Sequence, residues 1–298
     1  MPLLYQPQLT RRGFLRTTAV SLGALAALGV PRTFGETAGE STRWAFLSDT
    51  HVPEDITNEY RGFFPFENMK TAVKQVLDAD PEGAIITGDL ARLEGFPGNY
   101  AMLKSLTAPL VEKMPLGMAL GNHDHRANFY NAFPDHPGEN QSIKGKHVLI
   151  IEKPPVRLIL LDSLLFTNQV PGLLGKTQRE WLSTYLRSAD KTPTLLFFHH
   201  TPGDEDGSLL DTERLFASVI PHTAVKAIVF GHSHVYQIQE HLGVQLINLP
   251  AVGYNFRDAD PVGWIEATLT AQGGSFTLHA IGGNRQDDGK TVSLEWRA

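Results

Sequence analysis

Five short runs of this sequence bring together side chains that commonly bind metal ions. They read Asp49-Thr50-His51, Gly88-Asp89, Gly121-Asn122-His123-Asp124, Phe198-His199-His200 and Gly231-His232-Ser233-His234. The set combines hard oxygen donors with imidazoles and holds no thiolate, because the chain has no cysteine. Such donors suit Mn, Fe or Zn better than a soft metal. Each residue alone is more simply a turn, cap or core residue, so only their combination indicates a metal site.

The spacing within these runs favours convergence on one metal site. In an extended segment alternate side chains share a side, so Asp-x-His and His-x-His each direct two ligands the same way. Glycine precedes Asp89, Asn122 and His232. A glycine lets the backbone turn sharply and approach a ligand closely.

The runs follow apolar stretches that the pattern predicts to be buried strands. These cover residues 44–49, 84–89, 116–122, 195–199 and 227–232. Apolar spacing predicts helices over 66–77 and 100–113, and Thr177–Glu180 reads as a capping box that starts a third. Strands dominate from Val244, with a hairpin turn at Gly273-Gly274. The alternation predicts an α/β fold with two sheets, helices outside, and a ligand crevice at the carboxyl ends of the strands.

The five runs resemble the sequence blocks of the calcineurin-like metallophosphoesterase superfamily. Those blocks are D-x-H, G-D, G-N-H-[D/E], H and G-H-x-H, and all five occur here in order between residues 44 and 235. Residues 178–186 also resemble the helix before the fourth block in the class III cyclic-nucleotide phosphodiesterase branch. The resemblance implies a four-layer α-β-β-α sandwich of two mixed sheets flanked by helices, formed by residues 36–298 as a single domain.

The resemblance also implies the roles of individual residues in a centre of two divalent or trivalent metal ions (Mn, Fe or Zn). It implies hydrolysis of a phosphoester by a hydroxide that bridges the metals, with His123 as the catalytic residue that contacts phosphate and protonates the leaving oxygen. The metal ligands it implies are Asp49, His51 and His234 for one ion, Asn122, His199 and His232 for the other, and Asp89 as the bridge.

One position departs from the family pattern. Three residues after the bridging Asp, many members carry a carboxylate that orients the histidine of the third block, whereas this chain has Arg92. Glu94 or Asp124 could replace that carboxylate, and Arg92 could instead contact the substrate phosphate. His200, next to the expected ligand His199, would point into the pocket or lie behind the ligands, so it is a second candidate for substrate binding.

The expected activity is hydrolysis of a small phosphodiester, with a phosphomonoesterase as the alternative. A non-catalytic scaffold of the same fold is less favoured because every ligand position is retained, and a serine hydrolase lacks its G-x-S-x-G motif. Substrate selection would fall to loops at 53–66, 126–137, 201–210 and 253–260. The aromatic residues in these loops could stack on a base or simply pack, and packing is the commoner role.

The first 35 residues differ in composition from the rest. They hold Arg11, Arg12, Arg16 and Arg32 but no acidic residue, and the segment 10–16 resembles a twin-arginine export signal. We therefore expect residues 1–35 to be a leader read by the twin-arginine machinery, and the remainder to be periplasmic or secreted. No other segment approaches 18 apolar residues, so no stable membrane insertion is expected. The net charge of −6 argues against non-specific nucleic-acid binding. The sequence leaves the oligomeric state open.

Overall fold

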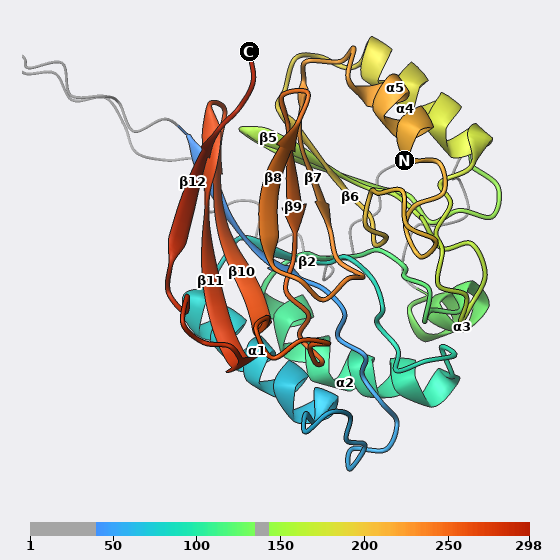
Figure 1. The fold of residues 1–298 in the computed structure, drawn as a ribbon, viewed down its shortest axis with the longest axis vertical. Helices are drawn as coiled ribbons and strands as arrows, with labels where there is room; N and C mark the ends of the chain where they lie inside the picture. Colours follow the sequence, from blue (N-terminus) through green and yellow to red (C-terminus); the bar gives the residue numbers. More distant parts are fainter. Residues whose placement is uncertain (1–39, 135–142) are drawn as a thin grey trace, which may run out of the picture.

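The computed structural model describes residues 40–134 and 143–298. The expected leader, residues 1–35, lies outside the described residues, as do 135–137 of one expected substrate loop. Two six-stranded sheets face each other, and helices cover their outer faces (Figure 1). Both sheets mix parallel and antiparallel pairs. The α/β fold predicted from the sequence, with two mixed sheets flanked by helices, is therefore confirmed.

In the first sheet, β1 (Ser41–Leu47) pairs in parallel with β2 (Gly83–Ile86) and antiparallel with β10 (Pro261–Thr270). Short parallel strands alternate with helices here, whereas the last three strands form an antiparallel meander, as the sequence pattern predicts. Across the sheet the order is β12 (Thr291–Glu295), β11 (Gly273–Gly283), β10 (Pro261–Thr270), β1 (Ser41–Leu47), β2 (Gly83–Ile86) and β3 (Leu116–Met118).

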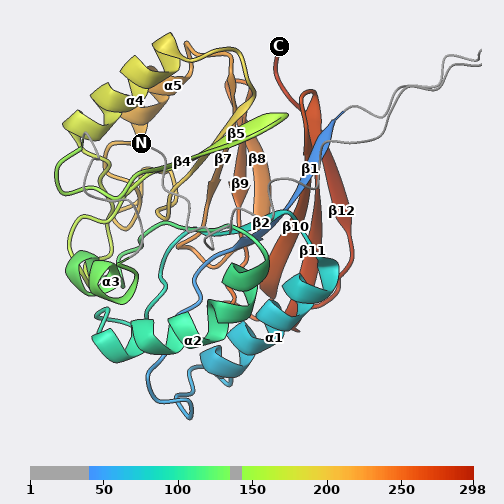
Figure 2. The same ribbon diagram turned by 180° about the vertical axis from the view of Figure 1, so that it is seen from behind.

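In the second sheet, four parallel strands are flanked by an antiparallel strand at each edge, and Figure 2 shows this sheet from the opposite side. Its order is β4 (Leu149–Lys153), β5 (Val156–Leu160), β6 (Thr194–Phe197), β7 (Val225–Phe230), β9 (Val244–Asn248) and β8 (Gln237–His241).

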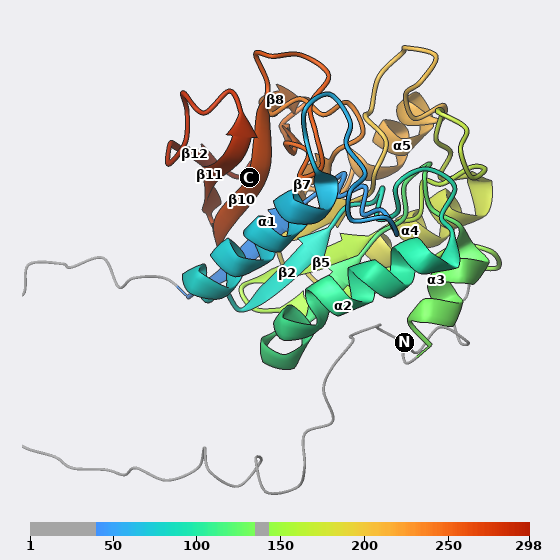
Figure 3. The ribbon, with the colours of Figure 1, turned by 90° about the horizontal axis from the view of Figure 1, so that it is seen from below.

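Helices α1 (Pro65–Ala79) and α2 (Pro97–Lys113) lie side by side over the first sheet, with the shorter α3 (Arg126–Ala132) beside α2 (Figure 3). Helices α4 (Lys176–Ser188) and α5 (Thr212–Val219) cover the second sheet. None of the helices in the described part of the chain has the length and apolar character that crossing a bilayer requires.

Three apolar clusters hold these layers together, and strand alternation assigns the side chains to them. In β1, Trp44 and Phe46 point into the cluster between the sheets, while Ala45 and Leu47 point toward α1 and α2. In β6, Leu196 packs in a third cluster, under α4 and α5. Because both faces of these central strands are buried, they read as continuous apolar runs in the sequence.

Two local expectations are wrong. Helix α4 begins at Lys176, with Gly175 as its N-cap, so Thr177 does not start a capping box. The amide groups of Leu174 and Gly175 donate instead to the distant carboxylate of Asp211, at 3.0 and 2.9 Å. A side chain from another element therefore supplies the acceptors at the start of this helix.

The hairpin between β10 and β11 exists, but its turn lies at residues 271–272, before the two glycines. The hydroxyl of Thr270 accepts from the amides of Gln272 and Gly273, which stabilises the turn without a glycine in it. Gly273 belongs to β11, where a β-carbon would lie 2.3 Å from the carbonyl oxygen of Leu294. Close approach of β12, rather than turn geometry, requires a glycine at this position.

Candidate metal centre

The expected metal ligands all lie in loops that follow the carboxyl ends of parallel strands. Strands β1, β2 and β3 of the first sheet and β6 and β7 of the second end at this common edge. The structure brings together every residue that the sequence predicted as a ligand. They are Asp49 and His51 after β1, Asp89 after β2, Asn122 after β3, His199 after β6, and His232 and His234 after β7.

The ligand pairs converge by a route that strand alternation did not predict. Asp49, His51, Asp89, His232 and His234 all have positive φ angles, between 45° and 73°. They therefore lie beyond the strands, in left-handed backbone rather than in extended segments. Non-glycine residues in this region cost on the order of 1–3 kcal/mol each, and such residues cluster at functional sites.

Two glycines of the predicted blocks are required by close packing. A β-carbon on Gly121 would lie 2.2 Å from the Asp89 carboxylate, and one on Gly231 would lie 2.3 Å from the Asp49 carboxylate. The chain segments that carry ligands can approach each other this closely only because these positions have no side chain.

In the first ligand group, two imidazole nitrogens face each other without a proton between them. The Nε2 atoms of His51 and His234 are 3.1 Å apart, and Oδ1 of Asp49 is 3.3 Å from Nε2 of His234. Each Nδ1 donates to a carbonyl oxygen, that of Arg92 at 3.2 Å and that of Tyr254 at 2.5 Å. Because carbonyls only accept, both Nε2 atoms present lone pairs. This arrangement fits a cation.

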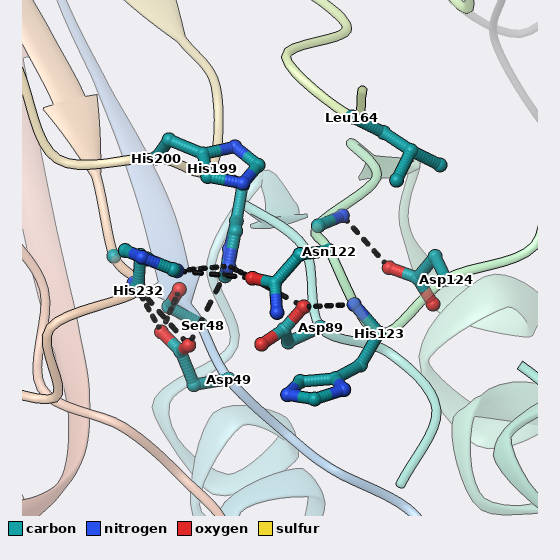
Figure 4. A network of polar contacts seen from close by, with 12 residues as sticks. Ser48, Asp49, Asp89, Asn122, His123, Asp124, Leu164, His199, His200 and His232 are labelled. Carbon is teal, nitrogen blue, oxygen red and sulfur yellow. Dashed lines mark hydrogen bonds and ion pairs between the residues drawn. The ribbon is translucent and has the colours of Figure 1, made fainter. Parts of the chain in front are cut away.

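The second ligand group has the same character (Figure 4). The amide Oδ1 of Asn122 lies 3.2 Å from Nε2 of His199 and 3.0 Å from Nδ1 of His232. Nε2 of His232 donates to the carbonyl of Gly207 at 2.9 Å, so its Nδ1 is the unprotonated nitrogen. An oxygen and two nitrogens thus meet around one point, which again fits a metal ion.

Asp89 is shared between the two groups. Its Oδ2 lies 3.7 Å from Nε2 of His51, and its Oδ1 lies 3.3 Å from Nε2 of His199. Ligand atoms of Asp89, His199 and His232 all lie within 4.8 Å of one another, as do those of Asp89, His51 and His123. One carboxylate therefore reaches both groups, which is the position of a bridging ligand.

Burial and the neighbouring carboxylates shift the pKa values of the histidines in the centre. Burial lowers the pKa of His51 to about 3 and that of His232 to about 4, so both rings are neutral at pH 7 and free to bind a metal ion. Burial also opposes the charge on His199, but Asp89 and Asp49 outweigh it and raise its pKa to about 9. Without a metal, a proton on His199 therefore offsets part of the negative charge of the two carboxylates. A bound metal ion would displace this proton and supply the positive charge in its place.

His123 is half-buried beside the shared carboxylate. Its backbone amide donates to Asp89 at 2.9 Å, and its Nδ1 lies 2.9 Å from the carbonyl of Leu93. Neither Glu94 nor Asp124 orients this ring. Asp124 is instead fully buried and accepts hydrogen bonds from backbone amides, including that of Gly121 at 2.8 Å. A backbone carbonyl has no signature in the sequence, so no pattern could have identified this partner.

Arg92 lies behind the centre. Its guanidinium stacks on the rings of Tyr60 and Tyr254, at 5.0 and 5.3 Å from the ring centres, and Nε donates to Asn58 at 3.0 Å. Its backbone carbonyl is the group that fixes His51. Arg92 thus connects the loop after β1 to the loop after β9, and direct contact with a substrate stays a prediction.

His200 is fully buried on the far side of His199. Its Nδ1 lies 2.8 Å from the hydroxyl of Ser163, which also accepts from the backbone amides of His199 and His200 at 3.3 Å each. Its ring packs on His232, with centroids 4.8 Å apart. This geometry matches the position behind the ligands that the sequence left open. Ser163, which the sequence analysis missed, supports both histidines.

A cavity of about 880 Å³ opens over the ligands. Its floor includes His51, Asp89 and His123, while Arg92 and His200 are not among the residues that line it. Its walls come from the expected loops 201–210 and 253–260. The lining residues from these loops are Thr201, Pro202, Gly203, Asp204, Glu205, Gly207, Ser208, Tyr254, Phe256, Arg257 and Asp260.

Two of the expected substrate loops do not line this cavity, because its lining includes no residue of 53–66 and no described residue of 126–137. Residues 126–132 form α3, and Phe129 is buried in the apolar cluster under the helices, at 2% exposure. The bond from the Asn128 amide to His125 caps this short helix. Phe129 therefore packs, as aromatic loop residues more often do.

Comparison with known proteins shows the family to which the chain belongs. The model of the calcineurin-like phosphoesterase family matches residues 42–236. The chain is 25% identical over 234 residues to a "Probable cyclic nucleotide phosphodiesterase" of Synechococcus, covering 72% of this chain and 84% of that protein. It is 28% identical over 244 residues to the 3',5'-cyclic adenosine monophosphate phosphodiesterase CpdA of Haemophilus influenzae, covering 76% and 85%.

Among solved structures, a dimetal phosphatase from Danio rerio is similar in fold. It superposes with a TM-score of 0.66 at 15% identity, covering 86% of this chain and 99% of that one. The family uses divalent metals, and the donor groups described above fit such ions. Since the family model spans all five ligand-bearing loops, the chain belongs to the calcineurin-like phosphoesterase family.

Proposed function

We propose that this protein is a metal-dependent phosphodiesterase with two metal ions in one centre. The observation that carries the proposal is the position of Asp89, whose two oxygens face the two ligand groups separately. Asp49, His51 and His234 would hold one ion and Asn122, His199 and His232 the other. Mn, Fe and Zn suit this donor set.

When bound, such a pair of cations lowers the pKa of water and neutralises charge on phosphate oxygens. The chain's own contribution is orientation and proton transfer. Because Nδ1 of His123 lies at the Leu93 carbonyl, Nε2 is the nitrogen left for the substrate. In the doubly protonated imidazolium form of His123, Nε2 would donate its proton to the departing oxygen and leave the ring neutral, which is general acid catalysis.

Two observations favour a diester over a monoester. Several relatives at 23–28% identity are named as cyclic nucleotide phosphodiesterases. In addition, Arg257 is the one Lys or Arg among the residues that line the cavity, and both its Nε and Nη2 donate to Asp260. A monoester carries a second negative charge, and no unpaired guanidinium or ammonium lines the described cavity to receive it.

The test is a paired assay on the Mn-loaded protein, with bis-p-nitrophenyl phosphate and p-nitrophenyl phosphate at neutral pH. We expect faster turnover of the diester than of the monoester. A chelator should abolish this turnover, and added Mn should restore it. A preference for the monoester would identify a phosphomonoesterase, and no turnover of either would favour a non-catalytic scaffold.

We also propose that the protein is exported by the twin-arginine route. The support is the segment 10–16, in which Arg11 and Arg12 are adjacent. Residues 1–35 fused to a folded reporter should direct it out of the cytoplasm, and replacing both arginines by lysine should retain it there. Export of the lysine variant at an unchanged level would refute this route.

A further inference from the structure

Phe256 is an exposed aromatic ring on the wall of the cavity. It retains 46% of its accessible surface and lies in the loop after β9. One face packs on the ring of the ligand His234, with centroids 4.3 Å apart and planes at 28°. The ring of Tyr254 approaches it at 78°. The face away from His234 is therefore the one available to a ligand in the cavity.

The backbone beneath this ring is fixed from several directions. Nη2 of Arg61 donates to the carbonyl of Phe256 at 2.7 Å, and Nδ2 of Asn68 donates to that of Gly253 at 2.8 Å. The Tyr254 carbonyl accepts a hydrogen bond from Nδ1 of His234, and the Tyr254 ring stacks on that of His51, with centroids 4.7 Å apart. A ring held in this way loses little conformational entropy when a ligand covers it.

The rest of the cavity defines what could lie on the ring. Val170, 54% exposed, is a second apolar side chain of the lining. Asp204 and Glu205 add negative charge to the lining, and Arg257 is paired with Asp260. An anionic group would be repelled here, whereas a neutral planar group would cover apolar surface at no electrostatic cost.

We propose that Phe256 determines specificity by stacking on a planar aromatic part of the phosphoester, such as a nucleobase. This inference rests on the proposed function, because the phosphate must lie at the metal centre for its substituent to reach the ring. Base–aromatic stacking typically changes affinity by about five- to a hundredfold. One face of the ring contacts His234, and the other would contact the base of the substrate. The bound base would thereby fix the position of the phosphate relative to the metal centre.

The test compares two ligands that differ only in the base. Binding of adenosine 5'-monophosphate and ribose 5-phosphate to the Mn-loaded protein is measured by titration calorimetry. We expect the wild-type protein to bind the nucleotide at least about tenfold more tightly, and Phe256→Ala to remove most of that difference. Phe256→Trp should retain it, and Phe256→Leu, which is apolar but lacks a π face, should retain only a small part.

Phe166→Ala is the matched control. Phe166 is also an exposed ring, at 62%, but does not line the cavity, so this variant should behave as wild type. Because Phe256 packs on His234, the metal content of each variant is measured with the binding.

Equal binding of both ligands by the wild-type protein, or an unchanged base preference in Phe256→Ala at full metal content, would overturn the inference. Turnover of bis-p-nitrophenyl phosphate by the wild-type protein is followed separately. Absence of this turnover would refute the proposed function. Turnover without a preference for the base-containing ligand would refute only the role of Phe256.

Discussion

Adding one methyl group to Gly121 should disable the metal centre. In Gly121→Ala the new β-carbon would lie 2.2 Å from Oδ1 of Asp89, 2.4 Å from its backbone nitrogen and 2.8 Å from Cδ2 of His199. Ordinary contacts are about 3.5–4 Å, so the shared carboxylate or the loop that carries it must move by about 1 Å. Backbone atoms cannot rotate away as the end of a flexible side chain can.

The size of the effect follows from this displacement. Overpacking of this kind costs about 1–3 kcal/mol, which corresponds to a fall in Tm of roughly 2–6 °C for a domain of this size. A misplacement of about 1 Å near the reacting atoms costs on the order of a hundredfold in rate. We therefore expect loss of at least one bound Mn per chain and a fall of about a hundredfold or more in kcat/KM for bis-p-nitrophenyl phosphate.

Gly117→Ala is the matched control, four residues earlier on the same segment. There the new β-carbon would meet only methyl groups of Leu160, Ile151 and Leu149, at 3.2–3.3 Å. Those side chains can shift by a few tenths of an ångström, so metal content and kcat/KM should remain near wild type. Titration with Mn, thermal unfolding and steady-state kinetics measure the three quantities. Two tightly bound Mn ions and normal activity in Gly121→Ala would show that close packing at this glycine does not position Asp89.

Three further predictions concern the same region. Asp89→Asn keeps the shape of the shared side chain but removes its charge. The Mn:protein ratio should therefore fall, and kcat/KM should fall by more than about a hundredfold. Retained activity would show that Asp89 does not bridge two metal ions. Because Asp89 and Asp49 raise the pKa of His199 to about 9 in the metal-free protein, a metal must displace that proton. The Mn affinity measured by titration should therefore rise by up to about tenfold per pH unit between pH 6 and 8. A pH-independent affinity would contradict that competition. Arg92→Ala removes the contacts to Tyr60 and Asn58, so the free energy of unfolding in urea should fall by about 1 kcal/mol with kcat/KM changed less than about threefold; a tenfold rise in KM would instead establish the substrate contact expected from the sequence.

Much of the fold could be predicted because burial leaves a direct record in the sequence. Strands β2, β6 and β7 and residues 44–47 of β1 are buried on both faces, and they read largely as apolar runs. The candidate ligand residues follow these strands in the sequence. They meet in space because the carboxyl ends of parallel strands lie at one edge of the sheet. The order of the motifs, together with their resemblance to the family's sequence blocks, therefore predicted seven candidate ligand residues, and the structure brings these residues together.

The remaining features depend on groups that have no sequence pattern. The carbonyls of Leu93, Gly207 and Tyr254 each face a histidine of the centre, and any residue type could supply them. The left-handed backbone of Asp49 and His51 is imposed by neighbouring segments. The start of α4 depended on a carboxylate from a distant part of the chain, which a local rule cannot detect.

The most direct test of the central claim is an anomalous difference map from crystals of the Mn-loaded protein. We expect two peaks, one beside Asp49, His51 and His234 and the other beside Asn122, His199 and His232, with an oxygen of Asp89 next to each. A single peak, or two peaks that do not share Asp89, would contradict it.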